Sequence, residues 1–125
     1  MSRNHEITVS VETQFMSEHS APDDGRFVFA YTITIRNTGS VRARLLSRHW
    51  IITDSNGKVE EVRGPGVVGE HPHLAPGEMY RYTSAAAIET PVGTMHGSYQ
   101  MLGDDGLAFD ANILPFRLAT TQTFH

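Results

Sequence analysis

Hydrophobic and polar residues alternate along much of the chain with a period of two, which is the pattern of β-strands with one buried face. The segment ITVSVETQF at residues 7–15 places an apolar side chain or threonine at every second position. Residues 27–35, FVFAYTITI, repeat the alternation with larger side chains, so we expect a central strand there. Later strands are predicted at residues 79–84, 94–102, 107–112 and 115–119.

One segment fits two patterns. In residues 41–50, Val41, Leu45 and Trp50 also follow helical spacing, which would suit an amphipathic helix. We predict a strand instead, because β-branched residues and a turn follow without a helix stop, and we expect a bulge near Leu45 and Leu46 to shift the alternation.

Two further segments carry local turn signals. Asn56-Gly57 between residues 50–53 and 59–62 predicts a β-hairpin with a tight two-residue turn, which requires a positive φ twice. The segment SAAAI at residues 84–88 is compatible with a helical turn that Pro91 would end.

Seven to nine short strands separated by turns predict an all-β fold. We expect one domain over residues 1–125, an antiparallel β-sandwich of the immunoglobulin or fibronectin type III kind. The chain has no cysteine, so apolar inner faces must hold the sheets together. Trp50 as a platform for a ligand is a secondary interpretation. The predicted core residues are Phe27, Phe29, Tyr31, Ile33, Trp50, Ile52, Tyr82, Tyr99, Phe109 and Phe116.

The absence of cysteine agrees with a reducing compartment, and the N-terminus has no apolar stretch typical of a signal peptide. Nor does any apolar run reach the length of a membrane span. We therefore expect a cytoplasmic protein that does not associate with a membrane.

Charge is unevenly distributed over the 125 residues, whose formal net charge is −4. Residues 36–63 contain six cationic and three anionic residues, a charge of +3, while the rest contains four cationic and eleven anionic residues, a charge of −7. The net charge disfavours nucleic-acid binding. Within this basic segment, Arg42 and Arg44 are the candidates for a surface that contacts a protein partner.

A glycine-rich segment at residues 64–69 matches G-x-G-x-x-G, the motif that surrounds a pyrophosphate in dinucleotide-binding folds. The context differs, because Pro72 and Pro76 leave no room for the helix that should follow. A nest of backbone N–H groups could still hold a small anion or nucleotide. The candidate ligand-binding residues are Arg63, Gly64, Gly66, Val67, Val68 and Gly69.

Seven histidines raise the question of a metal site. In an extended segment, His71 and His73 would lie on the same side, with Glu70 and Glu78 as nearby carboxylates. This is only half of a site, so divalent-metal binding is the weakest of our hypotheses, and we expect no cofactor.

Arg48 is two residues before Trp50, so the two side chains share one face of a strand. If Trp50 lies in the core, the Arg48 guanidinium needs a carboxylate or several carbonyls as partners, and we predict that it anchors a loop; the alternative is a pocket that faces an anion. No motif combines a nucleophile with a base at a recognised spacing, so we expect no enzymatic activity.

Longer stretches of the chain resemble the bacterial ApaG family. The residues that carry the resemblance are 45–54 (LLSRHWIITD), 67–72 (VVGEHP), Leu74, 76–78 (PGE) and 90–101 (TPVGTMHGSYQM). The resemblance implies an immunoglobulin or fibronectin type III-like sandwich and a small cytoplasmic protein without an established enzymatic activity. It also implies links to cobalt resistance and magnesium efflux, a role in protein contacts, and a proposed nucleotide or pyrophosphate site at Gly64, Gly66 and Gly69.

The leading hypothesis is therefore a non-catalytic module that binds a protein partner. The alternative is a small-anion or nucleotide binder, and the weaker alternative is a protein of cobalt or magnesium homeostasis that uses His71 and His73. An exposed edge strand would also offer a route to a homodimer.

Overall fold

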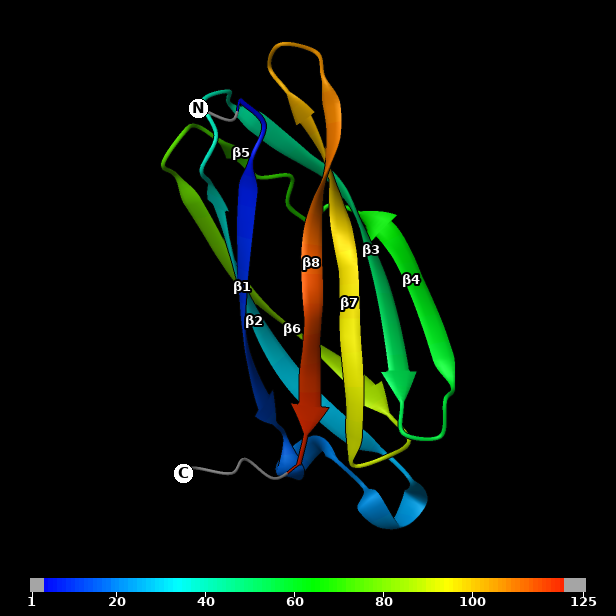
Figure 1. Ribbon diagram of the computed structural model, residues 1–125. Coiled ribbons are helices and arrows are strands. Elements are labelled where there is room, and N and C mark those ends of the chain that lie inside the picture. The colour runs from blue at the N-terminus through cyan, green and yellow to red at the C-terminus, as the bar shows by residue number, and fades with distance from the viewer. Residues whose placement is uncertain (1–3, 121–125) are drawn as a thin grey trace.

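The computed structural model describes residues 4–120, which form eight strands and two short 3₁₀ turns, Ser17–His19 and Pro22–Asp24 (Figure 1). The predicted all-β fold is confirmed. The strands are β1 (Ile7–Phe15), β2 (Phe27–Asn37), β3 (Ala43–Asp54), β4 (Val59–Pro65), β5 (His73–Leu74), β6 (Met79–Ile88), β7 (Val92–Gly103) and β8 (Ala108–Ala119). None of the described residues forms a helix long and apolar enough to cross a membrane.

Two antiparallel sheets form a sandwich, an arrangement consistent with the immunoglobulin or fibronectin type III architecture. One sheet has the strand order β1-β2-β6, and the other has the order β4-β3-β7-β8 with β5 paired to β3. The sheets meet closely where β1 contacts β8. At the opposite margin, β4 lies at the outer edge of its sheet (Figure 1).

The core lies between the inner faces of the two sheets. Trp50 is at its centre, with ring centroids 5.4 Å from Tyr31, 6.3 Å from Tyr99 and 5.9 Å from Phe116. These edge-to-face contacts add to the stabilisation that burial provides. Of the predicted core residues, Phe27, Phe109 and Phe116 are half-buried against the core, and the others are buried.

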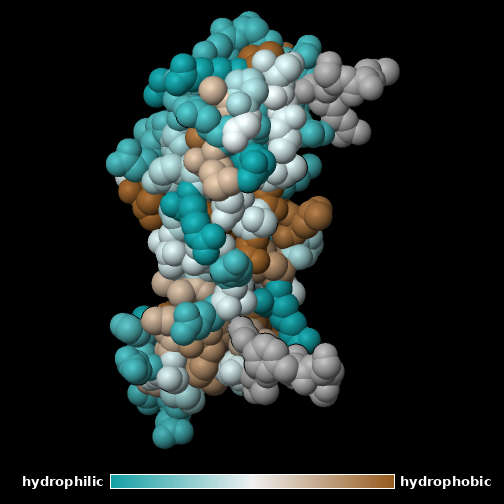
Figure 2. Space-filling model, turned by 90° about the vertical axis from the view of Figure 1, so that its left-hand side faces the viewer, coloured by the Kyte–Doolittle hydropathy of each residue, from teal (hydrophilic) through white to brown (hydrophobic). Residues whose placement is uncertain are grey.

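Apolar surface is interrupted on the face seen from the left-hand side of Figure 1. Figure 2 shows hydrophilic residues at both ends of this face and hydrophobic patches nearer the middle, separated by polar side chains. This side of the molecule therefore has no single continuous apolar patch among the residues that the structure describes.

The strand predicted over residues 41–50 is confirmed as part of β3, and the register shift between Leu45 and Ser47 is the bulge predicted there. The predicted hairpin between β3 and β4 is also confirmed, but the prediction of a two-residue turn is wrong. Asp54 N donates to Lys58 O, so three residues form the loop, and of these only Gly57 has a positive φ. The Asp54 carboxylate accepts bonds from the Asn56 and Lys58 amides and fixes this wider turn.

Three other local predictions need correction. Residues 84–88 belong to β6 rather than to a helical turn, because they pair with β2 from Phe27 to Tyr31. The two strands predicted at 107–112 and 115–119 are one strand, β8, whose pairing with β7 shifts between Met95 and Gly97. Pro115 is tolerated because β8 is an edge strand. The two-residue strand β5 was not predicted.

Candidate functional site

The glycine-rich segment is a tightly bonded loop that leads from β4 to β5 along the edge of β3. Gly66 N donates to Leu46 O at 2.9 Å, and Val67 and Glu70 exchange both of their backbone hydrogen bonds, at 2.9 and 2.8 Å. The residues between them, Val68 and Gly69, have φ values of 44° and 82°. Two consecutive positive φ values are typical of a type I′ turn.

Close contacts explain the first two glycines of the motif. A Cβ atom on Gly64 would lie 2.9 Å from Arg48 Nη2. On Gly66, which has a φ of 59°, a Cβ atom would lie 2.4 Å from Glu70 O. Gly66 therefore requires glycine, whereas a side chain at Gly64 would displace the Arg48 guanidinium.

Arg48 is the anchor of this loop, as predicted. Its Nη1 atom donates to Pro65 O at 2.9 Å and to Gly66 O at 3.0 Å. No carboxylate among residues 4–120 lies within ion-pair distance of its guanidinium. Two carbonyl acceptors thus satisfy a half-buried cation without neutralising its charge.

The residues predicted for anion binding are only partly brought together. Residues 64–69 are contiguous at the end of β4 and in the loop that follows it, but Val67 is fully buried and the Gly66 and Val67 amides already bond carbonyls. Arg63 is exposed on β4 opposite His49, on the strand face that alternates with that of Gly64. The chain then continues into β5 without a helix through residues 70–78, so the loop lacks a helix dipole.

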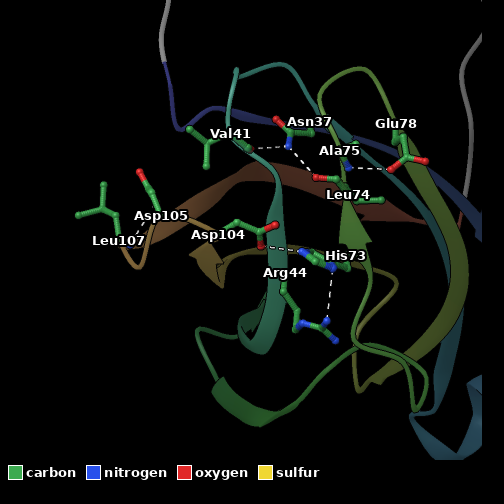
Figure 3. Close-up of polar contacts among 10 residues, drawn as sticks. All are labelled: Asn37, Val41, Arg44, His73, Leu74, Ala75, Glu78, Asp104, Asp105 and Leu107. Carbon is green, nitrogen blue, oxygen red and sulfur yellow. Dashed lines mark hydrogen bonds and ion pairs between the residues drawn. The ribbon is translucent and has the colours of Figure 1, made fainter.

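The two histidines proposed as metal ligands bond different partners. His73 Nε2 lies 2.7 Å from Asp104 Oδ1, and His73 Nδ1 lies 3.3 Å from Arg44 Nη2 (Figure 3). Because a guanidinium only donates, Nδ1 accepts and Nε2 carries the hydrogen that Asp104 accepts. His71 Nδ1 instead donates to Leu45 O at 3.1 Å. Within residues 4–120 no three metal-ligating side chains converge on one point.

Figure 3 shows Arg44 and Asp104 on either side of the His73 ring. The same turn between β7 and β8 is held on the other side by His5, whose Nε2 atom lies 2.8 Å from Asp105 Oδ2. The Leu107 amide, followed by His5, lowers the pKa of Asp105. The candidates Arg44 and His73, predicted for separate roles, thus belong to one polar cluster.

Exposed apolar side chains accompany the basic ones at this edge of the sheet. Val68 is 54% exposed and Leu46 is 38% exposed, while Arg42, just before β3, and Arg44, near its start, are also exposed. We call these four residues the β3 margin. The sequence pointed to the two arginines. It did not indicate that Val68 is exposed, because the positive φ of this residue cannot be read from the sequence.

A buried hydroxyl pair lies behind Arg48. The Tyr82 and Tyr99 hydroxyl groups hydrogen-bond each other, and burial raises the pKa of both phenols. The charge of Arg48 acts in the opposite direction without cancelling the effect of burial.

Comparison with known proteins assigns the family. A family model described as the ApaG domain matches residues 17–103. The chain is 57% identical over 121 residues to Protein ApaG of Methylococcus capsulatus and 58% identical over 121 residues to Protein ApaG of Pseudomonas aeruginosa, each time with 97% of this chain and 96% of the relative covered.

Solved structures agree with this assignment. A putative ApaA protein from Bordetella pertussis superposes with a TM-score of 0.94 at 48% identity, covering 98% of this chain and 100% of that chain. A protein from Archaeoglobus fulgidus, with a TM-score of 0.53 at 10% identity over 93% of this chain and 100% of that chain, shares the fold alone. The chain belongs to the ApaG family.

Proposed function

We propose that the protein is a non-catalytic binding module of the cytoplasm that recognises another protein through the β3 margin. The observation that carries this proposal is the conformation of Val68. This β-branched residue has a φ of 44° and is 54% exposed.

The conformation of Val68 lowers the stability of the protein without a compensating burial. A non-glycine residue in the left-handed region costs about 1–3 kcal/mol, and a β-branched side chain is among the least suited to it. Asparagine or glycine would occupy the same turn position with less strain. Strain of this kind is found preferentially at binding sites, which supports a role for an apolar side chain displayed at this point.

The arginines of the β3 margin supply charge beside this apolar contact. Arg44 is oriented by His73, which Asp104 holds from the other side. A partner that binds here therefore meets a guanidinium whose conformational freedom is already reduced, which lowers the entropic cost of binding. The excess of positive charge over residues 36–63 favours an acidic surface on the partner.

Affinity capture with four variants tests the proposal. Tagged wild-type protein is used to capture partners from a lysate of the source organism, beside Val68→Asn and Arg44→Glu. The matched controls are Val59→Asn, at another exposed valine, and Arg117→Glu, on strand β8 at the other edge of the sheet. We expect the test variants to lose a partner that both controls retain, and equal recovery by all four variants would exclude the β3 margin as the contact surface.

A different measurement on the same loop distinguishes the anion hypothesis from protein recognition. Pyrophosphate is added while the backbone amide resonances of residues 64–69 are followed by NMR. Unchanged resonances are expected if the loop serves protein recognition, because the Gly66 and Val67 amides already bond carbonyls. Saturable shifts confined to this loop would favour the anion hypothesis.

A further inference from the structure

The two sheets are unequal in width, and the difference leaves one strand uncovered. Three strands, β1, β2 and β6, face the four-stranded path β4-β3-β7-β8. Because β1 contacts β8 at one margin, the three-stranded sheet ends with β6 at the other margin. No strand of this sheet within residues 4–120 lies opposite β4. Figure 1 shows β4 at the outer edge of its sheet, to the right of β3.

A cleft of about 480 Å³ lies between the uncovered strand and the edge of the other sheet. Glu60 and Val62 of β4 line one side, residues 84–87 of β6 line the other, and Tyr31 and Trp50 line it from the core. At one end, an ion pair between Lys58 and Glu89 joins the two sheets. The cleft therefore has the position that a further strand beside β6 would take.

The edge of β6 beside the cleft is unprotected. Residues 83–88, TSAAAI, contain no charge, proline or glycine, and Ala85 and Ala87 are exposed. By contrast, the edge strands β4 and β8 each carry charged residues and a proline, Pro65 and Pro115. Charges and prolines on edge strands prevent pairing with other chains, so residues 83–88 of β6, unlike β4 and β8, are free to pair with an additional strand.

An unpaired indole N–H and two arginines without ion pairs lie along the same cleft. Trp50 is 2% exposed, and its indole N–H has no hydrogen-bond acceptor among residues 4–120. Such a buried donor is normally paired. Arg26 and Arg48 also line the cleft, and within the described chain neither forms an ion pair, whereas Glu60 is the single carboxylate that lines this space. The cleft thus has an excess of positive charge.

We propose that this cleft binds an extended peptide segment of a partner protein, which pairs with β6 as a fourth strand and covers the inner face of β4. Every second side chain of the peptide enters the cleft, an oxygen atom accepts the Trp50 N–H, and a carboxylate of the peptide lies near Arg48. This mode of recognition is β-strand addition, in which the backbone supplies affinity and alternate side chains supply specificity. The site is separate from the β3 margin and does not depend on the function proposed for it.

Peptides selected on the wild-type protein from a random dodecapeptide display library are the probe. The chain has one tryptophan, so its indole N–H gives a single NMR resonance that reports on the cleft. We expect an added selected peptide to shift this resonance and to slow hydrogen exchange of amides in residues 83–88 by about tenfold or more. The selected sequences are expected to alternate apolar residues and to include an acidic one.

Two neighbouring glutamates provide a matched pair of variants. Glu60→Lys removes the carboxylate that lines the cleft and is expected to raise the affinity for an acidic selected peptide. Glu61 lies on the alternate face of β4, 3.4 Å from His49 Nε2, so Glu61→Lys makes the same charge change outside the cleft and is expected to leave the affinity close to that of the wild type.

Proline variants test the strand pairing itself. Of Ser84 and Ala85, one directs its N–H at β2 and the other at the free edge, because consecutive amides of a strand alternate in direction. Proline at the free-edge position leaves the sheet folded and is expected to weaken peptide binding at least tenfold, about 1.4 kcal/mol. Ser84→Pro and Ala85→Pro are both made, and the variant that retains the wild-type circular dichroism spectrum is the informative one.

Several results would overturn the proposal. These are a library that yields no binder, a bound peptide that leaves the Trp50 resonance unchanged, or equal effects of Glu60→Lys and Glu61→Lys. Concentration-dependent protection of residues 83–88 in the protein alone would assign this edge to a second copy of the chain instead. The capture experiment on the β3 margin is unaffected by any of these outcomes, so the two proposals can fail separately.

Discussion

The guanidinium group of Arg48 lies against Gly64, where a Cβ atom would be 2.9 Å from Nη2. The missing side chain allows Arg48 to reach the carbonyls of Pro65 and Gly66. The first glycine of the motif therefore leaves space for the Arg48 guanidinium. Its contribution to the free energy of unfolding can be measured.

We expect Gly64→Ala to destabilise the protein by about 1–3 kcal/mol, since the added methyl group displaces Arg48 from its carbonyl acceptors. In an Arg48→Ala background the same change should be neutral or slightly stabilising, because alanine reduces the entropy of the unfolded chain relative to glycine. Urea unfolding of the four proteins in this double-mutant cycle measures the coupling. Additive effects would show that the two residues do not interact.

Val68→Asn is expected to raise the free energy of unfolding by about 1 kcal/mol, because Asn-Gly suits a turn with two positive φ values better than Val-Gly does. The control Val59→Asn replaces an exposed strand residue of normal backbone geometry and should not stabilise the protein. Thermal unfolding of both variants is the measurement. A lower melting temperature for Val68→Asn would contradict the strain inferred at this position.

Alkaline pH should destabilise the protein through Tyr82 and Tyr99. Burial raises the pKa of both phenols above the ordinary value of 10.0, so the folded state disfavours their ionisation. Their contribution to stability is therefore complete below about pH 10 and is lost as the pH rises further, because the unfolded state ionises first. Tyrosinate absorbance for these two of the four tyrosines is expected to develop only together with the loss of the folded circular dichroism spectrum.

Removing one hydroxyl of this pair tests the same contact at neutral pH. Tyr99→Phe leaves the buried Tyr82 hydroxyl without its partner, and we expect a loss of about 1–3 kcal/mol in urea unfolding. Tyr80→Phe, at a half-buried tyrosine of β6, the strand that also carries Tyr82, is the control and should have a smaller effect. Equal effects would mean that the hydrogen bond contributes little.

Acidic pH should weaken the turn between β7 and β8 through Asp105. The Leu107 amide and His5 lower the pKa of its carboxyl group from the ordinary 3.8. The stabilisation is present above that unfolded-state value and is lost as the pH falls through the lower folded-state value. Asp105→Asn is therefore expected to reduce the decrease in melting temperature between pH 5 and pH 3, an acid range set by the aspartate pKa. The same pH dependence in wild type and variant would contradict this assignment.

Divalent metal is expected to leave His73 undisturbed, because both of its ring nitrogens already have partners within the protein. Zn²⁺ titration followed by the imidazole resonances of His71 and His73 is the measurement. A saturable shift of both rings that His73→Ala abolishes would instead support the metal hypothesis.

Period-two alternation predicted β1 and β2 closely, since each strand has one face in the core. The alternation could not predict that β6 continues through residues 84–88, because three consecutive alanines show no alternation of apolar and polar side chains. Pairing with β2 decides the conformation of these residues. Glycine and proline positions correctly excluded a helix after Gly69. The burial of Val67 was not predictable, since its neighbour Val68 has the same side chain and an exposed position.

The candidate residues were predictable by chemical type but not by partner. Arg44, His73 and Asp104 are far apart in the sequence, and their contact depends on β5 pairing with β3 for two residues. A strand of that length has no periodic signal. The cleft could not be predicted from the sequence either, because it results from the difference in width between the two sheets rather than from any local sequence pattern.

The contact between β1 and β8 joins the first strand of residues 4–120 to the last one. During synthesis the N-terminal strand emerges from the ribosome long before its counterpart, so that margin of the sandwich stays open until residues 108–119 are available. Long-range pairings of this kind slow folding because the intervening chain must be ordered first. Closure of this margin of the sandwich is therefore a late step of folding that requires residues 108–119 to have been translated.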